Sequence, residues 1–553
     1  MPLRRYAKIY FLALALLLAL FSCILSAQQH GPAAELVAAE QLYRAGDFAA
    51  AADKYSALLK VDDKLTAAQV GLSRSLLRQQ KVDAAYDLAS KALAAQPNSA
   101  PLLAVMGDID FRRAQMPDAE RSYLAAITAD PKEARAYLGL ARLYRVVSLY
   151  RRAYDELVRA HQIAPGDPEV ERAWFSQLPR KQRIAAIEEY LAKPHPDDAE
   201  QSSSLERYLA FLKATIDQPA HACRLTSKVD ATAVRLEPLM IDAARLRGYG
   251  ISVKFNDRNA KLLLDTGASG VVIGRKLAEK SGLTRISEMQ FAGIGDKGPQ
   301  TGYLAHAQHI KIGDLDFEDC VVVVSDKTSI GEEDGLLGAD VFSRYLVDID
   351  IPGRQLKLSP LPKRPDAPEA PAGLNSQGET PASAEGKAAD AGAAKPDTAA
   401  PTLPRDRYIA PEMANWTRTF RFGHELLIPT LVNDSKPFLF LIDTGAFADT
   451  LSTNAAREVT RISSDSRLHV KGASGSVKDV YRADKATIQF GHMRQQNQDM
   501  VTFDLSNLSR HTGTEVSGIL GFAMLRMLEI KIDYRDGLVD FAYDPKRIPL
   551  NLR

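Results

Sequence analysis

The chain has 553 residues, of which 46% are hydrophobic and 25% charged, and its formal net charge is +1. This length allows several folded domains, and the balanced charge argues against a nucleic-acid partner. The three cysteines form no cluster that suits zinc, and no His-Glu-x-x-His or Gly-x-Ser-x-Gly motif occurs. The composition therefore predicts a multidomain globular protein that uses neither a metal nor a cofactor.

The N-terminus carries a predicted export signal. A basic segment at residues 4–8 precedes an apolar run at residues 9–25, which is the pattern of a signal peptide. We expect residues 1–27 to be removed by cleavage after Ala27, with lipid attachment at Cys23 or an uncleaved membrane anchor as alternatives. Each of these places the body of the protein outside the cytoplasm, either periplasmic or extracellular. Cleavage removes three basic residues and no acid, so the net charge falls from +1 to −2.

Residues 32–168 repeat with a period of 34 residues and with helical spacing. Small residues allow the two helices of a hairpin to approach closely, and a proline ends a helix before the next one begins. The segment resembles a tetratricopeptide (TPR) array of four repeats, with a generic helical bundle as the alternative. The resemblance implies a concave groove that binds a protein partner. The recurring small residues and prolines are Ala39, Ser73, Gly107 and Ala141, and Pro97, Pro131 and Pro165.

Two segments connect the predicted domains. Residues 169–225 contain helix-like stretches at Ile184–Ala192 and Ser203–Thr215, which either cap the array or continue it. Residues 362–405 are rich in Ala, Pro, Gly and acidic residues and have almost no large apolar side chain. Such a segment cannot bury enough surface to fold, so we expect a disordered linker. A linker of this kind would let the units on either side of it close on each other within one chain.

Two β-rich units, residues 226–361 and 406–550, carry three motifs in the same order. The first motif is Asp265, Thr266, Gly267 and Ala268 in one unit and Asp443, Thr444, Gly445 and Ala446 in the other, each after a run of large apolar residues. The second is a glycine-rich stretch with Gly293 and Gly295, or with Gly472 and Gly475. The third is Leu336, Leu337 and Gly338, or Ile519, Leu520 and Gly521. The last glycine follows the aspartate by 73 residues in the first unit and by 78 in the second.

Each unit resembles a retropepsin-like aspartic protease domain, the mainly-β half-unit that normally pairs to form an active protease. The resemblance implies that Asp265 and Asp443 are catalytic and that the Thr-Gly-Ala residues after each of them support the pair. It also implies that the glycine-rich stretches are flaps and that the apolar-Gly segments thread beneath the catalytic loops. The predicted fold class is multidomain α + β: an N-terminal α-solenoid of TPR-like hairpins followed by two retropepsin-like units.

The chemistry of this class needs two aspartates because they share a proton. Two carboxylates about 3 Å apart cannot both ionise, so the pair holds one proton. One carboxylate then acts as a general base on water, and the other acts as a general acid toward the scissile carbonyl. Gly267 and Gly445 suit this arrangement, because a residue without a side chain lets the loops turn tightly and approach.

The sequence thus predicts an exported aspartic endopeptidase whose repeats recruit a protein substrate or partner. The alternatives are an inactive peptide-binding scaffold, a dimer in which each unit pairs with its copy, and an assembly factor led by the repeats. The glycine-rich stretch from Gly293 to Gly298 also spells Gly-x-Gly-x-x-Gly, but strand-like sequence follows it and a nucleotide site requires a helix there. Cys223 and Cys320 would remain after signal removal, and an exported pair of this kind can form a disulfide. The N-terminal segment is the one expected point of contact with a membrane.

Overall fold

The computed structural model describes residues 31–216, 223–241, 246–291, 293–294, 300–326, 334–365, 403–465, 468–472, 474–497 and 500–547. The predicted signal peptide, including Cys23, and residues 366–402 of the predicted linker lie outside the described residues. The chain divides into two compact units. One unit holds the chain up to Gly139 with Ile163–Glu169 and Tyr190–Ala199, and the other holds Leu140–Gln162, Val170–Glu189 and everything from Glu200 onward.

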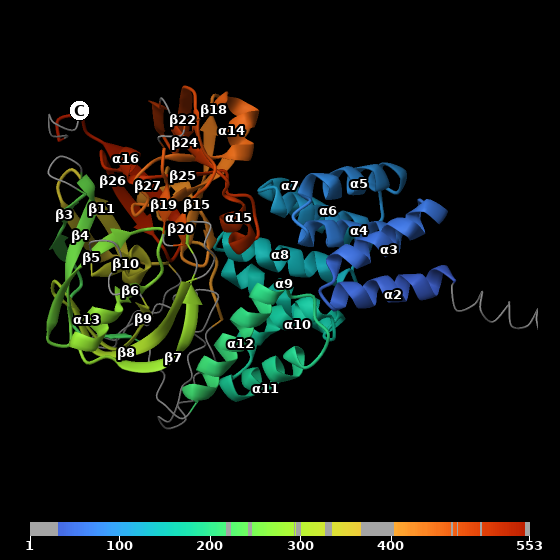
Figure 1. Cartoon of the computed structure of the whole chain (residues 1–553), viewed down its shortest axis with the longest axis horizontal. Coiled ribbons are helices and arrows are strands. Elements are labelled where there is room, and N and C mark those ends of the chain that lie inside the picture. Colours follow the sequence, from blue (N-terminus) through green and yellow to red (C-terminus); the bar gives the residue numbers. More distant parts are fainter. Residues whose placement is uncertain are drawn as a thin grey trace, which may run out of the picture. The chain divides into compact units, whose positions relative to one another are not determined.

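Helical hairpins make up the N-terminal part of the chain (Figure 1). The first helix of each hairpin begins 34 residues after the previous one, at Pro32, Thr66, Ala100 and Ala134, and the next helix begins at Pro168 in the same register. The small residues have the steric role that the sequence suggests: a Cβ on Gly107 or Gly139 would lie 2.5 or 2.2 Å from the ring of Tyr123. The helices are α2 (Pro32–Arg44), α3 (Phe48–Val61), α4 (Thr66–Arg78), α5 (Val82–Ala95), α6 (Ala100–Arg112), α7 (Met116–Ala129), α8 (Ala134–Val146), α9 (Tyr150–Ile163), α10 (Pro168–Trp174), α11 (Arg180–Leu191) and α12 (Ala199–Ala214).

The first β-rich half contains a nine-stranded sheet with one short helix, α13 (Arg275–Lys280). Its central strands run in the order β9-β6-β10-β5-β4-β8, so β10 lies between two strands that precede it in the chain. The strands are β1 (Arg224–Leu225), β3 (Glu237–Met240), β4 (Leu246–Phe255), β5 (Arg258–Asp265), β6 (Val271–Gly274), β7 (Thr284–Phe291), β8 (Gln300–Ile312), β9 (Leu315–Ser325) and β10 (Gly335–Gly338).

The second half repeats this arrangement in a ten-stranded sheet, in which β25 lies between β17 and β16. A separate two-stranded sheet is formed by β19 (Lys471–Gly472) and β20 (Gly475–Ser476). The helices are α14 (Thr453–Val459), α15 (Ser506–Thr512) and α16 (Phe522–Leu525). The strands are β14 (Phe420–Phe422), β15 (Glu425–Val432), β16 (Phe438–Ile442), β17 (Thr450–Ser452), β18 (Ile462–Ser464), β21 (Val480–Ala483), β22 (Ala486–Phe490), β23 (Met493–Asn497), β24 (Met500–Phe503) and β25 (Gly518–Leu520).

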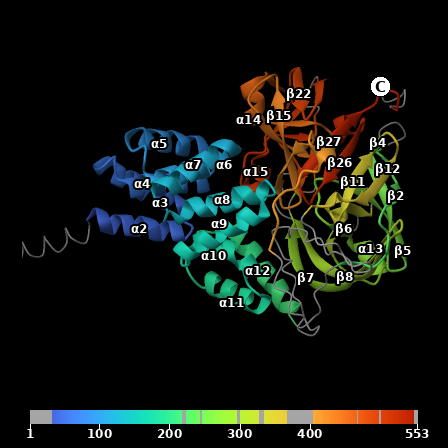
Figure 2. The same ribbon diagram turned by 180° about the vertical axis from the view of Figure 1, so that it is seen from behind.

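A six-stranded sheet joins the two halves, in the order β13-β27-β26-β11-β12-β2 (Figure 2). Its central contact is the antiparallel pairing of β11 with β26, in which Ile349 is opposite Ile530. Both isoleucines are buried in one hydrophobic core that extends through both halves. The two halves therefore share hydrogen bonds and a core. The strands are β2 (Thr232–Arg235), β11 (Tyr345–Asp350), β12 (Gln355–Pro360), β13 (Thr417–Arg418), β26 (Leu528–Asp533) and β27 (Leu538–Tyr543).

Cys223 and Cys320 form a disulfide across 97 residues of sequence. The bond fastens the start of the first half to β9, where β1 also pairs antiparallel to β9. This pairing could not be predicted, because sequence spacing alone does not place two distant cysteines together. Within the part of the chain that the structure describes, none of the helices combines the length and the hydropathy that a membrane crossing requires.

Candidate active site

The two Asp-Thr-Gly-Ala loops leave buried strands in equivalent positions of the two halves. Strand β5 ends at Asp265, and β10 runs parallel to it with Gly338 opposite Asp265. In the second half β16 ends at Ile442, just before Asp443, and β25 runs parallel to it with Leu520 opposite Ile442. The apolar-Gly segments thus form the strands beside the loops, and the N–H of Asp443 donates to the carbonyl of Leu520 at 3.0 Å.

Four hydrogen bonds made by the two threonines hold the loops together, two with the opposite strands and two with each other. The Oγ1 of Thr266 donates to the carbonyl of Ile442 at 2.8 Å, and the Oγ1 of Thr444 donates to the carbonyl of Leu264 at 2.9 Å. Each hydroxyl oxygen also accepts the N–H of the other threonine at 3.0 Å. All four bonds are buried, where loss of one partner leaves a polar group unsatisfied. The pairing therefore holds the two loops in one register.

The carboxyl groups of Asp265 and Asp443 lie close together, near enough for the charge of Asp443 to raise the pKa of Asp265. The glycines make this approach feasible: a Cβ on Gly445 would lie 2.3 Å from the Cγ of Asp265, and one on Gly267 would lie 2.7 Å from the Cγ of Asp443. The N–H of Gly267 donates to Asp265 at 2.8 Å. The N–H groups of Gly445 and Ala446 donate to Asp443 at 2.9 and 2.8 Å. These bonds orient each carboxylate within its own loop.

Burial raises the pKa of both aspartates. For Asp265, burial acts together with the negative charge of Asp443 and places the pKa well above the ordinary value. Burial likewise raises the pKa of Asp443, although the N–H donor of Ala446 opposes the rise. Since both shifts are upward, the pair retains a proton at pH values at which two exposed aspartates would be ionised. This is the protonation state that shared acid–base work requires.

Each half also extends a basic side chain to the Asp-Thr-Gly-Ala loop of the other half. The Nη1 of Arg247 donates to the carbonyl of Gly445 at 3.0 Å. The Nε2 of His424 lies 3.2 Å from the carbonyl of Gly267, and since only an N–H can donate to a carbonyl, this nitrogen carries the hydrogen. Sequence reasoning missed both residues. Their one signal is position, because they precede the two aspartates by 18 and 19 residues.

A third buried acid stands near the pair and was also missed from sequence. Glu425 is the first residue of β15 and is 5% exposed. Burial, with a further contribution from the charge of Asp443, raises the pKa of Glu425 to about 8. Glu425 is therefore protonated at neutral pH, and it adds no negative charge to a site that already holds two carboxyl groups.

In each half, a carboxylate connects the Asp-Thr-Gly-Ala loop to the neighbouring apolar-Gly segment, but its position in the sequence differs between the halves. In the first half Asp340, just after the apolar-Gly segment, accepts the N–H of Gly270 at 2.9 Å. In the second half Asp449, in the loop itself, accepts the N–H of Gly521 at 2.9 Å. The bracing carboxylate thus lies beside the apolar-Gly segment in the first half and in the loop in the second half. The two halves are therefore unequal in detail.

The glycine-rich stretches lie in contact with each other. The Oγ of Ser474 accepts the N–H of Gly293 at 3.1 Å, and the N–H of Ser474 donates to the carbonyl of Ile294 at 3.0 Å. Gly472 in β19 has no room for a side chain, since a Cβ there would lie 2.2 Å from the same carbonyl. Gly475 begins β20, and Gly295 lies outside the described residues. The role of these stretches as flaps stays a prediction.

Two similar halves, joined at their threonines and with their aspartates in contact, define the fold and site of an aspartic protease. Among the described residues, no group of three or more His, Cys, Asp or Glu side chains is placed to hold a metal ion. The family model for aspartyl proteases matches the chain twice, at residues 251–341 and 428–524. The two β-rich units are therefore similar to aspartyl proteases, in agreement with the resemblance that the Asp-Thr-Gly-Ala motifs indicate.

Curated relatives share part of this region. DNA damage-inducible protein 1 of Kluyveromyces lactis is 32% identical over 123 residues, which are 22% of this chain and 28% of the relative. UBA domain-containing protein Mud1 of Schizosaccharomyces pombe is 31% identical over 110 residues, which are 20% of this chain and 32% of the relative. The matched region thus spans about a third of these relatives. The crystal structure of an aspartic proteinase from Irpex lacteus aligns with 57% of this chain and 98% of its own, with 12% identity and a TM-score of 0.31.

Proposed function

We propose that the protein is an aspartic endopeptidase in which Asp265 and Asp443 of one chain activate a water molecule. The observation that carries this proposal is that two buried carboxyl groups lie together on loops joined by reciprocal threonine hydrogen bonds. The ionised carboxylate takes a proton from water, and the protonated one donates to the carbonyl oxygen of the peptide. The six-stranded sheet, made by both halves of one polypeptide, supports a dyad within a single chain.

We further propose that the protein is exported and that the repeats present a protein substrate or partner. The signal-like N-terminus supports export. The disulfide between Cys223 and Cys320 supports it too, because such bonds persist in oxidising compartments. Stacked helical hairpins at a regular 34-residue interval support the binding role, since arrays of this kind offer extended surfaces to other proteins.

The test is peptide hydrolysis across pH with the wild type, Asp265→Asn and Asp443→Asn. Each substitution removes one member of the pair, so we expect each to lower kcat/KM by about 10²–10⁴-fold. Asp257→Asn is the matched control, because the Asp257 side chain is 99% exposed. We expect a bell-shaped pH profile in the wild type, with the alkaline limb displaced upward because burial raises the pKa of both aspartates.

Two results would contradict the proposal. Retention of activity by either dyad variant would show that the pair is not the catalytic centre, or that each half pairs with a copy in another chain. Binding of peptides by the wild type without hydrolysis at any pH would favour the inactive scaffold.

A further inference from the structure

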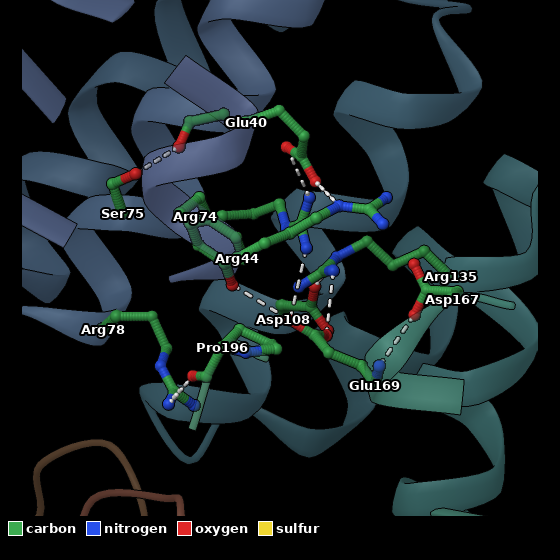
Figure 3. A network of polar contacts seen from close by, with 12 residues as sticks. Glu40, Arg44, Arg74, Ser75, Arg78, Asp108, Arg135, Asp167, Glu169 and Pro196 are labelled. Atoms are coloured by element: carbon green, nitrogen blue, oxygen red, sulfur yellow. Dashed lines mark hydrogen bonds and ion pairs between the residues drawn. The ribbon is translucent and has the colours of Figure 1, made fainter. Parts of the chain in front are cut away.

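A row of alternating charges follows the first helices of the hairpins (Figure 3). Glu40 in α2, Arg74 in α4 and Asp108 in α6 are 34 residues apart, so they occupy the same position in successive repeats. The Nη1 of Arg74 lies 3.8 Å from Glu40. Arg135, at the start of α8, forms an ion pair with Asp108. The repeats therefore present guanidinium and carboxylate groups on one shared face.

Glu169 inserts its carboxylate among these groups from outside the four repeats (Figure 3). It is the second residue of α10, and its Oε1 accepts the hydroxyl of Tyr43 at 2.9 Å and the Nη2 of Arg74 at 3.3 Å. Its Oε2 accepts the Nη1 of Arg135 at 3.1 Å. The three donors come from α2, α4 and α8, so a single carboxylate connects the first, second and fourth hairpins.

The donors around Glu169 form a built site for a carboxylate. Tyr43 is 2% exposed, and the side chains of Arg74 and Arg135 are only 15% and 20% exposed. The guanidinium carbon of Arg74 lies 4.2 Å from the centre of the Tyr43 ring, so the guanidinium group makes a cation–π contact with that ring. Burial raises the pKa of Tyr43 to about 12, so its hydroxyl stays protonated and donates. Partly buried guanidinium groups need an anion opposite them, because their desolvation is otherwise uncompensated.

Part of the negative charge around Arg74 and Arg135 comes from outside the repeats. Within the hairpins, Arg74 pairs with Glu40 and Arg135 pairs with Asp108. The segment after α9 supplies two further acids, Asp167 and Glu169, and the N–H of Glu169 donates to Asp167 at 2.9 Å. Glu169 is the acid that pairs with both of these arginines.

A second stretch of the chain lies on the same hairpins. The Nη2 of Arg78 donates to the carbonyl of Pro196, and a Cβ on Gly46 would lie 3.3 Å from the carbonyl of Asp197. Residues 163–169 and 190–199 both group with the first hairpins, although the intervening chain does not. The arginine-bearing face is therefore occupied by later parts of the same polypeptide.

We propose that Tyr43, Arg74 and Arg135 form a binding site for the carboxylates of acidic peptides, and that Glu169 occupies this site until such a peptide displaces it. An incoming carboxylate makes the same three hydrogen bonds, so exchange leaves no buried guanidinium unpaired. This inference names the partner class for the binding role proposed above. It does not depend on hydrolysis, and its test measures binding alone.

The test is fluorescence anisotropy of labelled short peptides with the full chain, in the Asp265→Asn background so that no peptide is cleaved. One peptide carries several glutamates and an amidated C-terminus, a second carries glutamines in their place, and a third is neutral with a free C-terminal carboxylate. We expect Glu169→Gln to bind a carboxylate-bearing peptide at least about tenfold more tightly than the parent, which corresponds to about 1.4 kcal/mol. Adding Arg74→Gln should remove this gain, and the amidated glutamine peptide should show none.

Glu40→Gln is the matched control, because it removes the same charge from the same ion-pair network and leaves Glu169 in place. Equal gains in Glu40→Gln and Glu169→Gln would overturn the proposal, since they would show an effect of net charge alone. No gain in Glu169→Gln would overturn it as well. If Glu169→Gln does not fold, Glu169→Asp replaces it, since the shorter side chain weakens the same contacts; a gain there supports the site, and its absence contradicts it. The first and third peptides show whether side-chain or terminal carboxylates are preferred.

Discussion

At the scale of single residues, the site depends on small groups at points of close approach. The threonine hydroxyls and the glycines of the two loops are short enough for the aspartates to meet. Every one of these residues belongs to a motif that is visible in the sequence. The neighbouring titratable side chains belong to no motif. Arg247 and His424 matter because they contact loops far along the chain, and Glu425 matters because it is buried near Asp443.

Glu425 provides a prediction about pH and stability. Its pKa in the folded protein is raised to about 8, whereas the ordinary value for glutamate is about 4.3. A raised folded pKa gives stability that is fully present below the ordinary value and is lost as the pH rises to about 8. Glu425→Gln has no charge to bury, so we expect its melting temperature to exceed that of the wild type by an amount that grows across this range and then levels off.

Differential scanning calorimetry at a series of pH values would measure this difference. Glu458→Gln is the control, because the Glu458 side chain is 50% exposed. Parallel curves for Glu425→Gln and the wild type across the whole range would contradict the assigned protonation state of Glu425.

At the scale of elements, the apolar-Gly strands decide how the loops are held. Strand β10 lies parallel to β5 and antiparallel to β6, and β25 has the same relation to β16 and β17. The sequence indicated two equivalent segments, and the resemblance supplied their placement beneath the loops. The sequence could not predict that the bracing carboxylate is Asp340 in one half and Asp449, at a different position, in the other. Each is a single side chain in a non-repeating position, so no periodicity marks it.

Gly338 at the end of β10 gives an element-scale prediction. A Cβ there would lie 2.5 Å from the carbonyl oxygen of Ala268, which belongs to the backbone and has little freedom to move. We expect Gly338→Ala to lower the free energy of unfolding by about 1–3 kcal/mol, as overpacking does, and to reduce hydrolysis by displacing the first catalytic loop. Chemical denaturation and peptide hydrolysis would measure the two effects.

The control for Gly338→Ala is Gly166→Ala, since a Cβ on Gly166 would have no neighbour within 4 Å. This control should leave both measurements near those of the wild type. A stable and active Gly338→Ala variant would contradict the prediction, because it would show that the loop at Ala268 can move without loss of stability or activity.

At the scale of the whole molecule, the ends of the predicted linker are fastened at one point. The Oδ1 of Asp536 accepts the Nη2 of Arg364 at 2.5 Å and the N–H of Tyr408 at 2.9 Å. The carbonyl of Asp536 accepts the Nε of Arg407 at 2.7 Å. Since Arg364 precedes residues 366–402 and Tyr408 follows them, these residues do not have to span a long distance. The two halves are held by the shared sheet and core.

We therefore expect that replacing residues 366–402 by about eight glycine and serine residues preserves the fold and any hydrolysis, because loop entropy changes only slowly with length. Circular dichroism melting and peptide hydrolysis would test this. Asp536→Asn serves as the contrast, since it weakens the anchor itself and should lower the melting temperature. Loss of activity on shortening, with the melting temperature unchanged, would show that residues 366–402 take part in function.

Local patterns in the sequence determined the class of each part of this protein. Period-34 small residues indicate helical hairpins, because steric fit between neighbouring helices is set over a few residues, and a repeated Asp-Thr-Gly-Ala after an apolar run carries the resemblance to an aspartic protease. Only the tertiary structure decided that the carboxyl groups of Asp265 and Asp443 lie together, that Cys223 meets Cys320 and that Glu169 reaches three hairpins. Such partners lie far apart in sequence, and electrostatic pairing of single side chains leaves no periodic trace along the chain.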